Sequence, residues 1–278
     1  MIHMQHLTEK KWNCLLIKSS LFLFVFLFSI TLQAQQLLYE IEVGEVASVD
    51  IDRKGYIYVA DEQGNVSQWI EGEKKRWYSP SSPAEVQIDA WAMLNTILFS
   101  EDWQGIRILG QQLTEQSEYI FDPNLVEYAS VATNASDGGI WLYDQGSFRL
   151  KKYFPDVNSI SIDVPLEQLI NSSSWEPIWM REHQNNLYVL DQYRGIFTFD
   201  LLGNILSEPY AVKRAKVIGL TSEEVYWLEK DELHFKALYS LETRYIKLPL
   251  KKVDYALYDH SSKKVFCFKQ KKMYAYQL

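Results

Sequence analysis

Apolar and polar residues alternate along this chain in a pattern that returns six times. Each copy is a strand-like stretch that ends in a charged residue and is followed by a short turn and a second strand-like stretch. The charged positions recur about every 40 residues, at Asp61, Glu101, Asp144, Asp191, Glu229 and Lys269. Short strands with a period of about 40 residues are typical of propeller blades. The sequence therefore predicts an all-β, six-bladed β-propeller.

Each of the first five repeats divides into four strands, so we expect four-stranded blades. Turns that contain glycine separate the four strands expected in the first repeat, which cover 46–52, 55–61, 65–70 and 75–78. The sixth repeat supplies three strands, and the segment 36–43, before the first repeat, has no place in it. Pairing 36–43 beside the strand 273–277 would complete the last blade and remove exposed sheet edges. We therefore predict that the N-terminal strand 36–43 closes the ring.

A basic head, an apolar run and a small residue follow one another at the start of the sequence. Three lysines precede the apolar run 21–32, and Ala34 follows it. This layout is typical of a secretory signal peptide with cleavage after Ala34. The alternative is a membrane anchor, but a spanning helix needs roughly 20 apolar residues, and this run is shorter. We expect residues 1–34 to be a signal peptide and residues 35–278 to be a single propeller domain.

The net charge limits the kinds of partner that we expect, and the cysteine content limits the bonds that can stabilise the fold. The formal net charge is −8, and it becomes −10 without residues 1–34, which hold three Lys and one Glu. An acidic chain does not favour phosphate backbones, so nucleic acid is not an expected partner. Cys14 lies in the expected signal peptide and Cys267 is the other cysteine, so the exported chain has no intramolecular disulfide. We expect a monomer that is stabilised by packing and has no transmembrane span after cleavage.

One repeat resembles a known family of propeller sequences. Residues 55–61 (GYIYVAD), followed by Gly64 and Asn65, are similar to an NHL-type repeat of six-bladed propellers, and residues 187–204 match it in part. The resemblance implies the architecture, but NHL-like propellers serve many roles, so it does not imply one function. The LQAQ junction around Ala34 resembles the signals of exported Gram-negative bacterial proteins. The expected location is therefore the periplasm or the outer membrane, or outside the cell after secretion.

The acids that end five of the six apolar stretches allow two interpretations. They would ring one face of the propeller, where they could bind a cation or a basic ligand. Alternatively, each acid accepts backbone N–H bonds in its own turn, as Asp commonly does. The repetition favours the turn role, because one ligand rarely needs an identical contact from every blade.

No catalytic motif can be assembled from the sequence. The histidines after residue 34 are His183, His234 and His260, which lack the spacing of zinc ligands, and nucleophile-elbow and phosphate-loop patterns are absent. We therefore expect no cofactor. A resemblance to six-bladed lactonases, which hold a divalent cation in the central channel, suggests an alternative. That alternative is a metal-dependent hydrolase or lyase with Glu45 and Glu176 as candidate ligands near the channel mouth.

Loop aromatics supply the candidate binding site. Most Trp and Tyr residues occupy strand positions and should pack between blades, whereas Trp103, Trp175 and Tyr193 fall in predicted loops and Arg194 adjoins Tyr193. These four residues belong to one face, which carries the turns between second and third strands. Aromatic and Arg side chains are typical anchors of interfaces, unless they pack onto a neighbouring blade. We predict an exported, non-catalytic scaffold that binds a protein partner, or another ligand, in the cell envelope.

Overall fold

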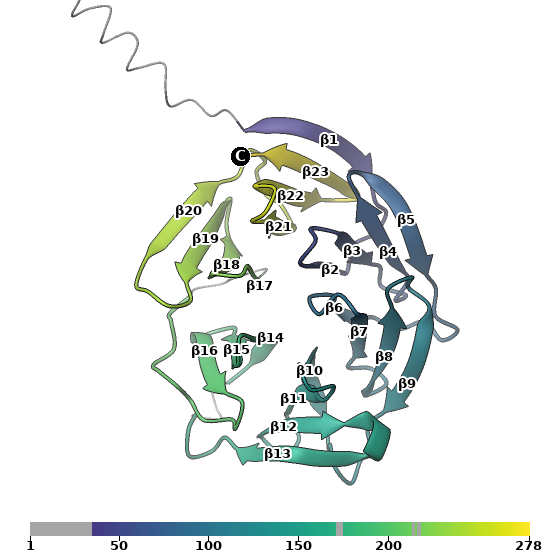
Figure 1. Ribbon diagram of the computed structural model, residues 1–278, viewed down its shortest axis with the longest axis vertical. Helices are drawn as coiled ribbons and strands as arrows, with labels where there is room; N and C mark the ends of the chain where they lie inside the picture. Colours follow the sequence, from purple (N-terminus) through teal and green to yellow (C-terminus); the bar gives the residue numbers. More distant parts are fainter. Residues whose placement is uncertain (1–34, 171–174, 213–214, 216–217) are drawn as a thin grey trace, which may run out of the picture. The chain divides into compact units, whose positions relative to one another are not determined.

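The described strands form six small β-sheets around a central axis in the computed structural model of the protein (Figure 1). The structure describes residues 35–170, 175–212, 215 and 218–278. Strands that follow one another along the chain pair antiparallel within each sheet, so each sheet is one blade. The predicted all-β, six-bladed propeller with four-stranded blades is confirmed.

The first three blades follow the order of the chain. The first consists of β2 (Ser48–Ile51), β3 (Ile57–Ala60), β4 (Val66–Ile70) and β5 (Glu73–Tyr78). The second consists of β6 (Gln87–Asp89), β7 (Asn95–Ser100), β8 (Gly105–Gly110) and β9 (Glu115–Ile120). The third consists of β10 (Ala129–Asn134), β11 (Ile140–Asp144), β12 (Arg149–Phe154) and β13 (Ser159–Pro165), with a short 3₁₀ helix, η1 (Pro155–Val157), before β13.

The last three blades complete the ring. The fourth contains β14 (Pro177–His183), β15 (Asn186–Asp191) and β16 (Gly195–Asp200). The fifth consists of β17 (Ile218–Leu220), β18 (Glu224–Glu229), β19 (Glu232–Ala237) and β20 (Thr243–Lys247). The sixth contains β21 (Tyr255–Asp259), β22 (Lys264–Lys269), β23 (Lys272–Gln277) and, beside β23, β1 (Gln36–Glu42).

The outer edge of the fourth blade is irregular. The segment expected as its fourth strand, 206–210, runs beside β16 and meets it through isolated bridges at Ile196–Tyr210 and Phe199–Ile205. The register changes between the two bridges, and Pro209 lies in this interval. Tyr210 and Ile196 exchange both of their backbone hydrogen bonds, so position 209 has its N–H side facing away from β16, where an edge strand tolerates proline.

β1 lies beside the last strand of the ring. It is the outermost strand of the sixth sheet (Figure 1). Just after it, the Val43 N–H donates to the Lys271 carbonyl at 2.8 Å. Tyr39 and Ile41 pack, partly buried, against the core between the sixth and first blades. That this strand holds the ring closed stays a prediction, which deletion of the strand would test.

The core is a series of layers between neighbouring blades. Between the third and fourth blades, Trp141 and Phe199 are fully buried in one such layer. Between the fifth and sixth blades, the rings of Tyr226 and Tyr258 meet edge to face at 6.1 Å. Each blade therefore buries both of its faces. This explains why the second strands are continuous apolar runs, since every residue of β3 and of β11 is buried.

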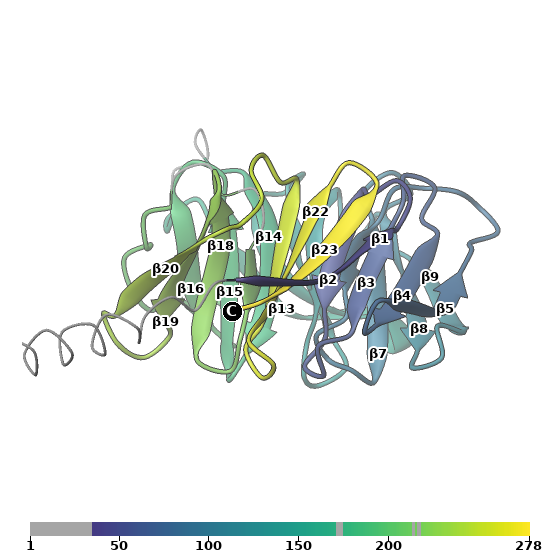
Figure 2. The same ribbon diagram turned by 90° about the horizontal axis from the view of Figure 1, so that it is seen from above.

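The turns gather at two faces of the propeller (Figure 2). One face carries the turns between the first and second strands of each blade, and we call it the β2–β3 face after the turn in the first blade. The opposite face carries the turns between second and third strands and the connections between blades, and we call it the β3–β4 face. The loop residues predicted to form the binding site belong to the β3–β4 face.

Aspartates at the ends of second strands stabilise their own turns, as one of the two interpretations predicted. Asp61 accepts backbone N–H groups from its own turn at 3.0 Å. Asp191 accepts the N–H groups of Tyr193 and Arg194 at 2.9 and 2.6 Å. Asp144 accepts the N–H and the hydroxyl of Ser147 in its own turn at 3.4 and 2.7 Å, and also backbone N–H groups from the strand connection before it. The turn role is confirmed for these three residues.

The contact pattern places residues 37–277 in one compact unit. The predicted signal peptide, residues 1–34, lies outside the described residues. Across the described ranges, no helix has the length and apolar character that crossing a bilayer requires.

Candidate functional site

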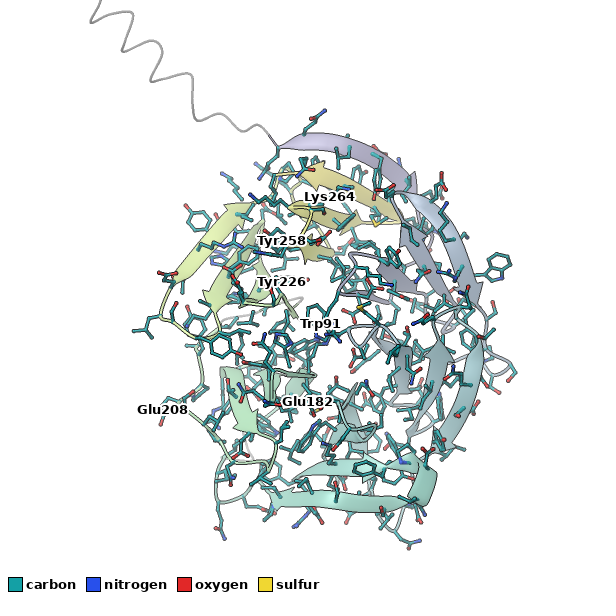
Figure 3. All side chains as sticks on the ribbon, in the orientation of Figure 1. Trp91, Glu182, Glu208, Tyr226, Tyr258 and Lys264 are labelled. Atoms are coloured by element: carbon teal, nitrogen blue, oxygen red, sulfur yellow. The ribbon has the colours of Figure 1, made fainter. Side chains whose placement is uncertain are left out.

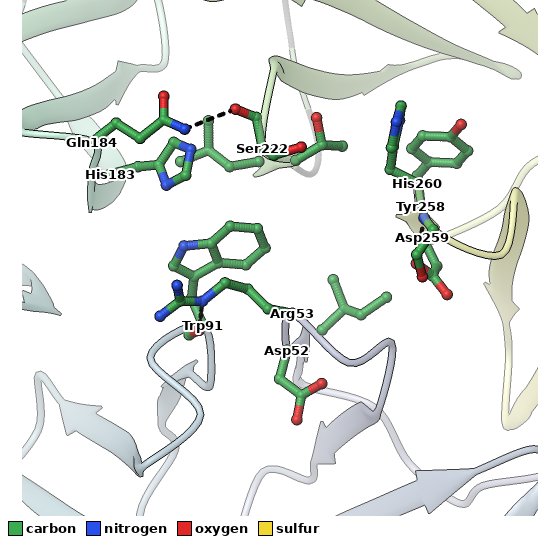
Figure 4. A pocket seen from close by; sticks show the side chains of 13 residues that line it. Asp52, Arg53, Trp91, His183, Gln184, Ser222, Tyr258, Asp259 and His260 are labelled. Carbon is green, nitrogen blue, oxygen red and sulfur yellow. Dashed lines mark hydrogen bonds between the residues drawn. The ribbon is translucent and has the colours of Figure 1, made fainter.

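A cavity of about 420 Å³ opens on the β2–β3 face, at the mouth of the central channel (Figure 4). The turns of the first, second, fourth, fifth and sixth blades line it, through Arg53, Trp91, His183, Ser222 and His260, respectively, among others. First strands are the innermost strands of a propeller, so the turns that follow them converge on the axis. Cavities of about 300–1,000 Å³ are the usual size of small-molecule sites.

Trp91 occupies the centre of this mouth, near the axis of the ring (Figure 3). Its backbone N–H donates to Asp89 Oδ1 at 3.1 Å, and its carbonyl accepts the Arg53 Nε–H at 3.2 Å. The indole ring meets the His183 imidazole edge to face, with 5.5 Å between the ring centroids. The guanidinium carbons of Arg53 and Arg181 both lie 5.8 Å from the indole centroid. The ring is therefore fixed from several blades at once.

A second cavity of about 190 Å³ adjoins the first and shares Arg53, Trp91, His183 and Gln184 with it. We call the 420 Å³ cavity the larger lobe and this one the smaller lobe. The larger lobe includes apolar surface from Leu220 and Tyr258, whereas the smaller lobe is lined mainly by polar side chains: Asp89, Asn134, Ser136, Arg181, Glu182 and Asn185. The larger lobe also has polar lining residues, including Asp52, Thr221 and Asp259, so the shared residues form the border between a lobe richer in apolar surface and a mostly polar one.

A buried ionic cluster lies behind Trp91. Arg181 Nη2 lies 2.7 Å from Asp50 Oδ2 and 3.4 Å from Asp89 Oδ1, and all three side chains are buried. The same three residues also line a third cavity, of about 270 Å³, which includes residues from the other end of the channel. Burial raises the pKa of Asp50, and the Arg181 charge opposes this shift. Burial lowers the pKa of Arg181, but Asp50 and Asp89 outweigh it and raise that pKa.

The carboxylates that line the larger lobe are engaged within the protein. Asp52 accepts hydrogen bonds from the backbone N–H groups of Lys54 and Tyr56 at 2.8 and 3.0 Å. Burial raises the pKa of Asp52 above its ordinary value. Asp259 accepts the hydroxyls of the two serines that follow it in the turn, at 2.7 and 2.5 Å. Burial acts to raise the pKa of Asp259, but these serine hydrogen bonds outweigh it and lower that pKa.

Two side chains at the mouth, Arg53 and His183, are only partly engaged, and the His183 ring already hydrogen-bonds the Ser222 backbone. Arg53 is exposed, and no carboxylate in the described part of the chain forms an ion pair with it. His183 Nε2 is buried and lacks a hydrogen-bond partner among the described residues. Burial lowers the pKa of His183, and the nearby charges of Arg53 and Arg181 act in the same direction. The imidazole is therefore neutral at pH 7.

Three of the four residues predicted to form a binding site, Trp175, Tyr193 and Arg194, lie together in the fourth blade, and Trp103 lies in the second blade. Trp175 is buried, and its ring packs edge to face on Phe197 with 4.8 Å between centroids. The Arg194 guanidinium carbon lies 5.3 Å from the centroid of the same Phe197 ring. Trp103 is half-buried in the second blade, against Arg107. Tyr193 is the exposed member, with 63% of its surface accessible.

The Trp175 ring is therefore packed inside the protein, which is the alternative stated for the loop aromatics, and a role for Trp175 in binding stays a prediction. The connection before the fourth blade folds this side chain into the layer between the third and fourth blades. Whether Trp103, Tyr193 and Arg194 bind a partner stays a prediction.

The two candidate metal ligands lie in blades that face each other across the ring. Glu45, just before β2, forms an ion pair with Lys271 at 2.5 Å. Glu176, just before β14, forms a hydrogen bond with Tyr193. Within the described ranges, no group of three or more His, Cys, Asp or Glu side chains is placed to hold a metal ion. Glu45 and Glu176 do not belong to one such group. Whether the protein binds a divalent cation stays a prediction that metal analysis would test.

No pattern in the sequence pointed to Arg53, Trp91 or Arg181, and the turn histidines had no expected role. Five of the six blades contribute one or a few residues to the larger lobe, and these residues lie about 40 positions, or multiples of it, apart in the sequence. No local motif can therefore reveal the site. The available signal was the position of each residue in or near a turn between first and second strands, because those turns meet at the axis.

Comparison with known proteins identifies the fold and no family. No family model matches the sequence, and no curated protein matches it. The NHL resemblance therefore stays a prediction.

Several solved structures share the architecture. Virginiamycin B lyase from Staphylococcus aureus is similar with a TM-score of 0.62 and 13% identity, over 88% of this chain and 100% of that chain. A streptogramin B lyase gives 0.58 and 16% identity, over 87% of this chain and 88% of the other. The Pan2 WD40 domain of Neurospora crassa gives 0.60 and 6% identity, over 87% and 94%. At these identities the similarity shows the fold alone.

Proposed function

We propose that this protein is an exported, non-catalytic binding propeller whose ligand site is the cavity around Trp91. The observation that carries the proposal is the convergence of turns from the first, second, fourth, fifth and sixth blades on one cavity of about 420 Å³. A concave site of this size suits a small organic ligand better than a protein surface, which needs a broad contact area. Export is proposed from the sequence of residues 1–34.

The chemistry of the mouth supports binding without catalysis. Its carboxylates are held by turn hydrogen bonds, as for Asp52 and Asp259. A general base needs a free lone pair within reach of the substrate, and His183 Nε2 is the unpartnered nitrogen at the mouth. We assign the mouth a binding role because no nucleophile among the described residues is hydrogen-bonded to that nitrogen. Trp91 and Tyr258 provide ring surface, and Arg53 provides charge. These groups suit recognition of a ligand.

A fragment screen by ligand-observed NMR tests the proposal. We expect fragments that bind the wild-type protein to show no binding signal with the Trp91→Ala variant, because this change removes the central ring of the site. Trp77→Ala is the matched control, since Trp77 is 72% exposed on the outer strand β5, away from the channel. Circular dichroism would show that both variants are folded. Fragment binding that survives in Trp91→Ala, or no fragment binding at all, would refute the proposal.

Sequencing the N-terminus of the protein recovered from its source cells tests export. We expect the chain to begin at Gln35 and to be found in the periplasm or with the outer membrane. A chain that retains the apolar run 21–32 in a membrane fraction would indicate an anchor instead.

A further inference from the structure

We propose that the channel mouth recognises an amphipathic anion, with a planar apolar group in the larger lobe and a carboxylate held by Arg53 at the border with the smaller lobe. This inference rests on the proposed function and names the chemistry of the ligand.

The carboxylates that line the two lobes are hydrogen-bonded within the protein. The acids around the lobes each accept hydrogen bonds from the protein on both carboxylate oxygens, and these bonds offset part of the attraction that the acids would exert on a ligand cation. Asp89 accepts the N–H groups of Trp91 and Asn134 at 3.1 and 3.0 Å and the Thr133 hydroxyl. Glu182 accepts the Trp141 Nε1–H at 2.7 Å, and its other oxygen accepts a backbone N–H at 2.9 Å. The acids of both lobes thus hold the fold together.

The guanidinium groups of Arg53 and Arg181 have hydrogen-bond donors that lack an acceptor among the described residues. Arg53 uses its Nε–H on the Trp91 carbonyl, and no described carboxylate pairs with its guanidinium. Arg181 is 2% exposed and lines the smaller lobe, and its Nε has no hydrogen-bond partner among the described residues. A buried donor without an acceptor is costly. A ligand carboxylate at this border would supply acceptor oxygens for N–H groups of Arg53 and Arg181 that have no acceptor among the described residues.

Aromatic rings and aliphatic side chains give the larger lobe its apolar surface. In the larger lobe, Tyr258 and His260 meet edge to face with 6.2 Å between ring centroids, and Leu220 and Ile51 add aliphatic surface. Trp91 stands at the border between the lobes, with Arg53 beside it (Figure 4). Aromatic rings prefer offset-stacked or edge-to-face contact with other rings. A planar apolar group therefore fits the larger lobe while its acid group reaches Arg53.

Three probes of one shape and different charge test the inference by isothermal titration calorimetry. They are 2-naphthoate, neutral 2-naphthamide and cationic (2-naphthylmethyl)ammonium. We expect 2-naphthoate to bind the wild-type protein at least about tenfold more tightly than the other two, because an ion-paired, hydrogen-bonded carboxylate forms a stronger contact. Its affinity should also fall as salt is added, since the guanidinium of Arg53 is exposed and screened.

Two charge variants place the effect at Arg53. Arg53→Gln should reduce 2-naphthoate affinity about tenfold, to the level of the amide. Lys54→Gln removes the same charge from the neighbouring position, which does not line either lobe, and should change the affinity by less than about twofold. The melting temperature of each variant would be measured as a check on folding.

The outcomes separate this inference from the proposed function. Equal or tighter binding of the amide or the ammonium probe, absence of 2-naphthoate binding, or an equal loss in Arg53→Gln and Lys54→Gln would overturn the inference. The proposed function would survive each of these results if other fragments still bind in a manner that depends on Trp91. It fails only if the fragment screen finds no such ligand.

Discussion

Arg181 and Asp50 join blades that face each other across the central axis, through two hydrogen bonds between residues 131 positions apart in the sequence. Arg181 Nη1 donates to Asp50 Oδ1 at 3.2 Å, and Nη2 donates to Oδ2 at 2.7 Å. The two-point geometry is the strong form of an Arg–carboxylate pair. Because β14 and β2 both lie at the axis, this pair ties the first and fourth blades together behind the ligand cavity.

Replacing Arg181 with Met should strongly destabilise the protein. The change keeps much of the side-chain volume and leaves two buried carboxylates, Asp50 and Asp89, without their counter-charge. Breaking a buried pair in this way typically costs about 3–5 kcal/mol, which urea unfolding would measure. Arg149→Met, which breaks the more exposed pair with Asp163, is the control and should cost less than about 1 kcal/mol. Equal losses would mean that the Arg181 pair contributes no more than a surface contact.

Deleting residues 36–43 should lower the melting temperature markedly. The deletion removes β1 and exposes the partner edge of β23, together with the apolar surface that Tyr39 and Ile41 cover. Lys272→Ala, which breaks only the exposed ion pair with Glu40 on β1, should leave the melting temperature nearly unchanged. If the deletion behaves like Lys272→Ala, β1 has no part in closing the ring.

Trp175→Ala and Tyr193→Ala should behave in opposite ways. Trp175 is buried against Phe197 and Tyr143, so its removal leaves a large cavity and should cost about 3–5 kcal/mol in denaturant unfolding. Tyr193 is largely exposed, so its removal should leave the melting temperature nearly unchanged. If a protein partner binds the β3–β4 face, Tyr193→Ala should weaken its capture from envelope fractions. A stable Trp175→Ala variant would show that this ring is not part of the core.

His183 should make the stability of the protein depend on pH below about 6.5. Burial holds its pKa in the folded protein below the ordinary value of 6.5, so the unfolded chain takes up the proton first. The contribution of His183 is therefore fully present above pH 6.5 and is lost as the pH falls toward the pKa of the folded state. Melting curves from pH 8 to about pH 5 should show a shallower decline for His183→Gln than for the wild type. Parallel curves would show that His183 does not titrate on unfolding.

Metal analysis of the purified protein distinguishes binding from the metal-dependent hydrolase or lyase alternative. We expect no stoichiometric divalent cation, because Glu45 is paired with Lys271 and Glu176 with Tyr193. A bound cation that is lost in Glu176→Gln would instead favour the alternative and require a rearrangement of this face.

The architecture could be predicted because its signals are local. A second strand that is buried on both faces, such as β3 or β11, must be a continuous apolar run. An apolar run of that length between turn residues can be identified from the sequence. The turn role of Asp61 and Asp191 could be predicted for the same reason, since each bonds within a few residues. The outer edge of the fourth blade shows the limit, because the change of register between its two bridges to β16 is a property of the paired strands.

The candidate site could not be predicted in the same way. Loop position suggested exposure for Trp175, but a connection between blades can turn a ring inward, and only the neighbouring blade decides whether a pocket receives it. Arg53, Trp91 and His183 had no shared motif, because each comes from a different blade.

The repeat, the number of blades and the chemistry of individual turns follow from the order of the amino acids, because strand alternation and turn hydrogen bonds act over a few residues. Which residues meet at the axis depends on the folded ring. The ring brings residues about 40, 80 or more positions apart to one channel, and there Arg181 finds Asp50 while Arg53 lies beside Trp91 without a carboxylate partner among the described residues. The energy of such a charge depends on its burial and its partners, and both are properties of the folded ring.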